Sequence, residues 1–162
     1  MNLTQYQDTE NAYQANMKKY ISFSLDNNEF CLDIMTVREI GGWSEPTPLP
    51  HSPEYVCGVI NLRGTVLPII DFAKRIGIRR VGAAPRRPVI IVMQIESRLF
   101  GIKVDSVSDI LMIDSSKMQP LPDNTSEATH TFLESILAME DQMIRVVAPA
   151  SIYINATMDV LQ

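Results

Sequence analysis

The side chains that could carry out covalent chemistry are few, and their surroundings do not support a reaction. The only histidines are His51, in a proline-rich stretch, and His130, in a polar stretch. A Cys57–His51 pair could be imagined as nucleophile and base, but nothing near it in the sequence would orient the base or stabilise an oxyanion. Metal-ligand spacings such as CxxC, HxxxH or HExxH are absent, and so is the phosphate-binding pattern GxxxxGK[ST]. The sequence therefore predicts no enzyme, no metal and no organic cofactor.

Two charged residues interrupt apolar segments and invite a functional interpretation. Arg63 lies at the tip of an otherwise apolar predicted hairpin, and Glu39 lies between Val37 and Ile40. The structural alternative is an ordinary solvated turn charge for the first and a charge that blocks a sheet edge for the second. The functional alternative is a surface on which charges fix the register of a partner protein. The residues alone leave both alternatives open.

Composition and length limit the class of protein. The chain has 162 residues, 46% of them hydrophobic and 20% charged, which is ordinary for one globular domain or two small, tightly joined ones. Its net charge of −5 argues against general binding to nucleic acid or to an acidic membrane surface. The two cysteines, Cys31 and Cys57, lie in apolar runs and are expected to be buried free thiols.

The N-terminal region does not have the pattern of a signal peptide. Residues 1–17 are polar and are expected to form a flexible tail. No stretch approaches the roughly 20 apolar residues that would span a bilayer. We therefore expect a cytoplasmic protein that does not insert into a membrane.

The elements that must position these residues are mostly strands. Apolar residues alternate with polar ones over residues 21–25 and 30–34, with turn-forming residues between them, which predicts a β-hairpin. Residues 59–70 predict a second hairpin with its tight turn at Gly64. Short helices are predicted at 52–58, with Ser52 as N-cap, and at 71–77, with Asp71 as N-cap and Gly77 as the stop signal.

The second half of the chain repeats this pattern. Residues 90–110 match residues 20–40 in phase and without a gap, and residues 137–147 match residues 60–70. Strand periodicity is generic, so any two hairpins look somewhat alike, but a gapless match of this length favours a true repeat. Each half would supply about five short strands, enough to close into a small barrel. Two such barrels side by side would share an apolar seam and leave a groove, which is a common type of binding site.

The domain organisation follows from the repeat. A first barrel is predicted at roughly 18–80 and a second at roughly 88–155, with terminal strands that can swap between them. Residues 156–162 are predicted to form a C-terminal tail.

The run GVINLRGTVLPIID from Gly58 to Asp71 resembles the signature of the CheW-like family, the coupling proteins of bacterial chemotaxis. Residues 30–40, 100–110 and 136–147 resemble further family segments, in the family's order and spacing. The resemblance covers roughly residues 18–155. It implies an all-β fold of two SH3-like five-stranded barrels packed side by side.

The same resemblance implies function and site residues. It implies a non-catalytic scaffold that couples transmembrane chemoreceptors to the histidine kinase CheA and is recruited to receptor arrays at the inner membrane. The implied partners are the CheA regulatory domain and the cytoplasmic tips of methyl-accepting chemoreceptors. The positions that would face these partners are Val37, Glu39, Gly58, Arg63, Val89 and Ile110. A module of the same fold that serves a motility or surface-sensing pathway is the alternative, and the sequence does not separate the two.

Overall fold

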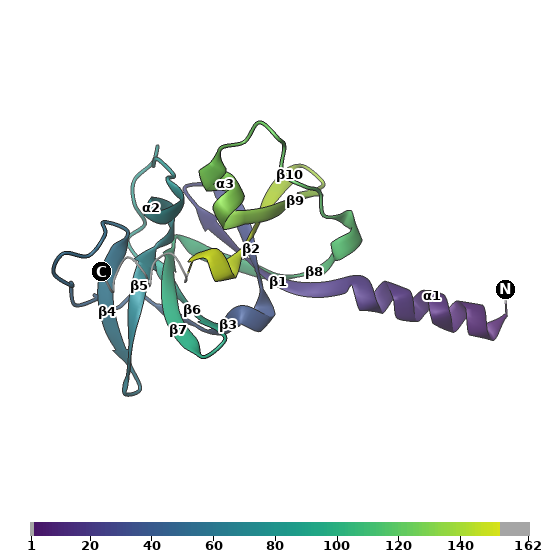
Figure 1. Ribbon diagram of the computed structural model, residues 1–162, viewed down its shortest axis with the longest axis horizontal. Helices are drawn as coiled ribbons and strands as arrows, with labels where there is room; N and C mark the ends of the chain where they lie inside the picture. Colours follow the sequence, from purple (N-terminus) through teal and green to yellow (C-terminus); the bar gives the residue numbers. More distant parts are fainter. Residues whose placement is uncertain (1, 153–162) are drawn as a thin grey trace.

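β-strands make up about half of the structure, a computed structural model that describes residues 2–152 (Figure 1). The strands are β1 (Met17–Leu25), β2 (Asn28–Asp33), β3 (Val37–Gly42), β4 (Val56–Leu62), β5 (Thr65–Asp71), β6 (Val89–Ile95), β7 (Arg98–Val104), β8 (Ser106–Asp114), β9 (Leu133–Met139) and β10 (Gln142–Val147). The helices are α1 (Leu3–Asn16), α2 (Phe72–Ile76) and α3 (Glu127–Phe132), with 3-10 turns η1 (Ile34–Thr36) and η2 (Ser115–Lys117). The predicted C-terminal tail, 156–162, lies outside the described residues.

The strands form two five-stranded sheets, which confirms the predicted fold class. Sheet A has the order β8-β1-β2-β10-β9, and sheet B has the order β3-β6-β7-β5-β4. In each sheet one pair of neighbours is parallel, β2 with β10 and β7 with β5, and the other pairs are antiparallel. The two sheets therefore have the same topology, as expected for a repeated unit.

Each sheet is closed into a barrel by a single bridge between its two edges. The chain that leaves β3 bends back, and Thr47 pairs with Val59 of β4 through backbone hydrogen bonds of 2.8 and 2.9 Å. The chain that leaves β8 does the same, and Gln119 pairs with Ile136 of β9 through two bonds of 2.8 Å. These bridges satisfy backbone groups that an open edge would leave unpaired.

The sheets do not follow the two halves of the sequence. Sheet A combines β1 and β2 from the first half with β8, β9 and β10 from the second, and sheet B combines β3, β4 and β5 with β6 and β7. The exchange involves a whole hairpin, which is more than the terminal strands that the sequence predicted. It begins at η1, where Asp33 accepts a hydrogen bond from the Met35 amide and the chain leaves sheet A. Strand β3 then pairs with β6 in sheet B.

The largest apolar core lies along the seam between the sheets. It includes Phe23 and Phe30 from sheet A, Ile91 from sheet B and Phe72 from α2, each at most 1% exposed. The rings of Phe23 and Phe30 stack with centroids 5.6 Å apart, and the ring of Phe72 lies 5.8 and 6.0 Å from theirs. Two smaller clusters lie around Val146 of sheet A and around Ile69 of sheet B. Because the main core needs both sheets, neither barrel is complete on its own.

One of the two predicted short helices is confirmed. The Asp71 carboxylate caps α2 by accepting a hydrogen bond from the Lys74 amide, and Gly77 ends the helix with φ of 81°. The prediction of a helix at 52–58 is wrong, because residues 52–55 are irregular or in a turn and β4 begins at Val56. The Ser52 hydroxyl donates to the Leu49 carbonyl oxygen instead of capping a helix.

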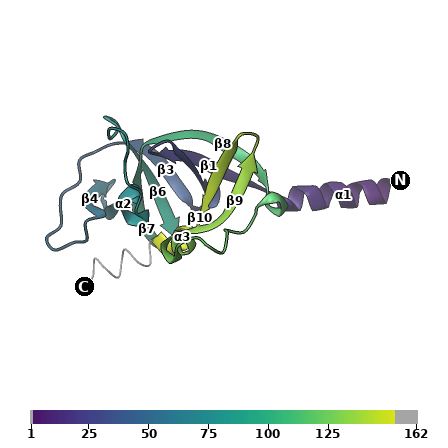
Figure 2. The same cartoon turned by 90° about the horizontal axis from the view of Figure 1, so that it is seen from above.

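The N-terminal segment that was predicted to be a flexible tail is helical. In both views α1 stands away from the sheets, and its described side chains are exposed (Figures 1 and 2). It leads directly into β1, which starts at Met17, four residues before the alternation at residues 21–25. None of the helices in residues 2–152 is long and apolar enough to cross a membrane.

Candidate functional site

Arg63 and Glu39, which the sequence singled out separately, contact each other. The Arg63 guanidinium lies 2.9 Å from a Glu39 carboxylate oxygen. Arg63 sits in the turn of the β4–β5 hairpin, whose shape is held by a hydrogen bond of 2.9 Å from the Gly64 amide to the Asn61 side chain. The Arg63 side chain is 80% exposed and that of Glu39 is 28% exposed. The ion pair therefore leaves most of the guanidinium open to a partner.

The backbone of β3 explains how Glu39 reaches this position. The register between β3 and β6 shifts between Val37 and Glu39, as in a β-bulge. Bulges bend a strand and redirect its side chains. Val37 packs against the seam core, whereas Glu39 faces the β4–β5 turn.

Hollows flank the ion pair on both sides. One, of about 720 Å³, lies between β3 and β4, and the other, of about 680 Å³, lies between β3, β5 and β6. Both are lined by Glu39, Leu62 and Val92, so the charged pair separates two parts of one groove. We call this the paired-charge groove. Its floor includes Val92, which is 3% exposed, and its rim carries opposite charges. An apolar floor with a few charges suits the docking of a protein segment.

Gly58 lies in β4 next to Val59, which lines the groove, and it has a clear structural requirement. Its φ is +142°, a conformation that residues with a side chain rarely adopt. A Cβ at this position would lie 2.2 Å from the carbonyl oxygen of Thr47. Thr47 is the residue that closes sheet B, so Gly58 permits the close approach of two backbones.

The other predicted partner residues are spread over the molecule. Val37 and Val89 are half-buried against the seam core, and Val89 pairs with Gly42 at the far end of β3. Ile110 lies in sheet A on β8 and is 61% exposed. The structure thus brings Glu39 and Arg63 together, with Gly58 in the adjacent strand, but it does not bring Ile110 to the same sheet.

Sequence reasoning missed an exposed apolar neighbour of Ile110. Met112 is 54% exposed and follows Ile110 on the same side of β8. The continuous apolar run at 110–113 conceals which face is buried, because alternation in the sequence is absent there. Only the burial of Ile113 shows that Ile110 and Met112 face outward.

The thiols and histidines do not form a reactive group. Burial raises the pKa of Cys57, and it raises the pKa of Cys31 to about 12. A raised pKa keeps a thiol protonated at neutral pH, which is the opposite of what a nucleophile needs. His51 is exposed, and within residues 2–152 no cluster of three or more histidine, cysteine or acidic side chains could hold a metal ion. Cys57 is only half-buried, so the expectation of two buried thiols holds for Cys31 alone.

Comparison with known proteins gives consistent matches over most of the chain. Residues 19–155 match the family model described as CheW-like domain. The chain is 47% identical over 136 residues to the chemotaxis protein CheW of Rhizobium meliloti (strain 1021), covering 84% of this chain and 87% of that protein. It is 32% identical over 128 residues to the chemotaxis protein CheW of Klebsiella aerogenes, covering 78% and 76%.

A solved structure has the same fold. The scaffolding protein TtCheW from Thermoanaerobacter tengcongensis superposes with a TM-score of 0.73 at 35% sequence identity. The match covers 80% of this chain and 88% of that one.

Proposed function

The chain belongs to the CheW-like domain family, and we propose that it couples transmembrane chemoreceptors to the histidine kinase CheA. The family is one of chemotaxis scaffolds without catalytic activity. In this role the chain binds two proteins at once and changes neither chemically. It works in the cytoplasm, at receptor arrays on the inner membrane, and its partners are the CheA regulatory domain and the receptor tips.

The observation that best supports this proposal is the paired-charge groove. An exposed guanidinium, held in place by a less exposed carboxylate, presents a planar donor fork to a partner carboxylate. The apolar floor beside it can receive an apolar side chain of the same partner. The proposed partner-facing set also includes Val37, Gly58, Val89 and Ile110.

Charge reversal tests this proposal. We expect Arg63→Glu and Glu39→Lys each to weaken binding to at least one of two probes, a receptor-tip fragment and the CheA regulatory domain, by about tenfold or more, because like charges would face each other. Lys117→Glu, at an exposed position in η2, is the matched control and should bind normally. Dissociation constants from calorimetry and melting temperatures would be measured together.

A charge-swapped double variant separates two roles of the pair. Glu39→Arg combined with Arg63→Glu keeps an internal ion pair but inverts the charges offered to a partner. We expect binding to stay weak. Full recovery would mean that the pair acts only within the chain, and unchanged binding in both single variants would contradict the proposed site.

A further inference from the structure

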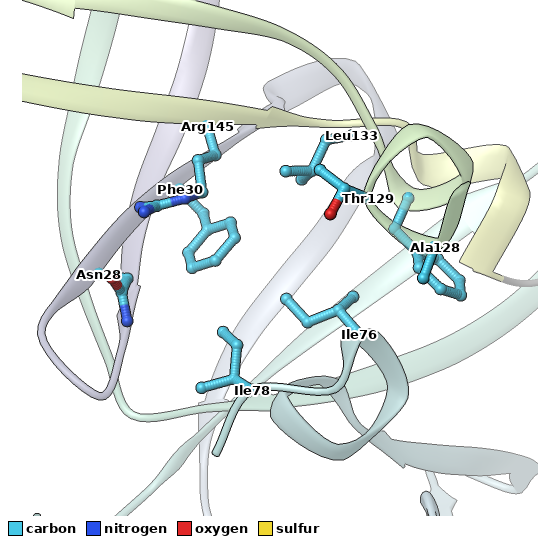
Figure 3. Close-up of a pocket in the computed structure, with 9 residues that line it drawn as sticks. Asn28, Phe30, Ile76, Ile78, Ala128, Thr129, Leu133 and Arg145 are labelled. Atoms are coloured by element: carbon cyan, nitrogen blue, oxygen red, sulfur yellow. The ribbon is translucent and has the colours of Figure 1, made fainter. Parts of the chain in front are cut away.

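A separate cavity opens at the seam between the two sheets, away from the paired-charge groove. Its volume is about 170 Å³, so only a small ligand fits. Figure 3 shows Ile76 and Ile78 on one side, Ala128, Thr129 and Leu133 opposite them, and Arg145 with Asn28 at one end. These residues come from both halves of the chain, and the cavity lies over the seam core.

Six of the nine residues that line the cavity are apolar, although polar atoms make up about half of the surface they expose. Phe30, Phe132 and Leu133 belong to the seam core, and Ile76 and Ile78 pack against it. A ligand that fits this cavity would therefore combine a compact apolar body with a polar group.

One charged side chain lines the cavity, and it is a cation. The Arg145 guanidinium lies 5.4 Å from the centre of the Phe30 ring. Among the described residues Arg145 forms no ion pair with a carboxylate. A guanidinium that lines a cavity without such a partner favours an incoming carboxylate at its end of the cavity.

Asn28 and Thr129 add polar groups around the apolar centre. The Asn28 amide nitrogen already donates to the carbonyl oxygens of Leu25 and Asp26, so the side-chain oxygen is what Asn28 can offer to a ligand. The Thr129 hydroxyl oxygen points toward the cavity in Figure 3 and shares a hydrogen bond of 2.8 Å with Ser126. No acidic side chain lines the cavity within residues 2–152, and a carboxylate that pairs with Arg145 must lie away from the Asn28 side-chain oxygen, which would repel it.

We propose that this seam cavity binds a small monocarboxylate with an aryl or branched alkyl body. The apolar body sits over Phe30 and Phe132, and the carboxylate pairs with Arg145. The inference goes beyond the coupling function and does not rest on it, because none of its residues belongs to the paired-charge groove.

A matched pair of probes tests the charge preference directly. 3-Phenylpropionate and its neutral amide, 3-phenylpropionamide, differ in the group that would meet Arg145. Titration into the intact chain would be followed by NMR of the methyl groups of Ile76, Ile78, Ala128 and Leu133. We expect both probes to shift these methyl signals, and the acid to bind about tenfold more tightly.

Three variants make the test specific. Arg145→Gln should remove the preference for the acid while leaving weak binding of both probes. Ala128→Phe should fill the cavity and abolish both titrations. Arg38→Gln, which removes an arginine of the paired-charge groove, should change neither.

Two results would overturn the proposal. One is equal affinity for acid and amide in the unmodified chain, a comparison that needs no variant to fold. The other is no saturable shift of the cavity methyl groups by either probe.

Discussion

The Arg63–Glu39 ion pair is a weak contributor to folding, although it is well formed. Arg63 is 80% exposed, so water screens its charge and competes for its donors. Exposed pairs of this kind usually contribute less than about 1 kcal/mol. We therefore propose a role in binding, and not in stability, for this arginine.

The first prediction follows from this exposure. Arg63→Ala should lower the free energy of unfolding by no more than about 0.5 kcal/mol, as measured by urea denaturation. A loss of several kcal/mol would make the arginine structural and would contradict a role limited to binding.

Unlike Arg63, Gly58 is expected to be important for the stability of the fold. Gly58→Ala should destabilise the protein strongly, because a Cβ would collide with the Thr47 carbonyl at 2.2 Å and the backbone is already strained for any side chain. Strained backbone alone costs about 1–3 kcal/mol. Gly42→Ala is the control, since nothing lies within 4 Å of a Cβ built there. Equal denaturation midpoints for the two variants would show that the close approach to Thr47 is not required.

Part of the candidate site could be predicted from the sequence, but the contacts between its residues could not. Arg63 and Glu39 stood out because charges are unusual in apolar segments. Their contact did not, because it joins a hairpin tip to an edge strand of a sheet whose pairing was unknown. Gly58 stood out only through the family resemblance, since the clash with Thr47 depends on how the chain bends back after β3.

At the scale of elements, the basic loop between α2 and β6 is fastened to both sheets. The Arg80 guanidinium donates two hydrogen bonds to the Asp105 carboxylate, 2.8 and 2.5 Å long. Asp105 also accepts a bond of 2.8 Å from the Asp26 amide in the β1–β2 turn. The Asp26 carboxylate in turn accepts a bond of 2.8 Å from the Val81 amide. The loop thus ties a turn of sheet A to the end of β7 in sheet B.

The stability that the Arg80–Asp105 interaction contributes depends on pH. The Arg80 hydrogen bond holds the pKa of Asp105 below its usual value. A carboxyl with a lowered folded-state pKa stabilises the fold above its ordinary pKa of about 4 and loses that contribution as pH falls through the folded value.

We therefore predict that Asp105→Asn lowers the free energy of unfolding by about 1–3 kcal/mol at pH 7. The difference from the unmodified chain should begin to shrink below about pH 4, where the carboxyl of the unfolded chain takes up a proton, and it should be lost once pH falls below the lowered folded-state pKa. Asp123→Asn, at an exposed position, is the control. A difference that stays constant from pH 7 to pH 3 would show that the ionised carboxylate is not the source of the stability.

Strand pairing is the part of the fold that sequence patterns did not determine. Alternation at residues 21–25 correctly indicated a strand and the burial of Ile21, Phe23 and Leu25, but not the burial of Ser22, which is 4% exposed. The same alternation is compatible with any neighbouring strand, so it did not reveal that β3 pairs with β6 instead of remaining with β2. The α2 helix was predictable because its capping residues, Asp71 and Gly77, lie next to it in the sequence. The exchange of hairpins depends on strands that are far apart in the sequence.

At the scale of the whole molecule, the two halves of the sequence need each other. Each sheet takes strands from both halves, and the seam core lies between the sheets. A fragment of residues 1–86 or 87–162 would leave strands without partners and apolar faces open to water.

We predict that neither fragment folds alone. Each should give amide NMR spectra with little dispersion, and mixing the two should restore the dispersed spectrum of the intact chain. A well-dispersed spectrum for fragment 1–86 alone would contradict the interlocked arrangement.

The paired-charge groove and the seam cavity are independent parts of this molecule. The groove lies on sheet B, and the cavity opens between α2, α3 and strands of sheet A. Occupation of the cavity by a carboxylate therefore need not block the groove.

We propose that this chain joins two proteins, and sedimentation velocity of a receptor-tip fragment and the CheA regulatory domain, with and without this chain, tests this proposal. We expect the two probes to sediment in one complex only when the chain is present. Glu39→Lys or Arg63→Glu should disrupt this complex, while the variants keep the melting temperature of the unmodified chain. A chain that binds neither probe, or a complex that forms equally well with both variants, would contradict the proposal.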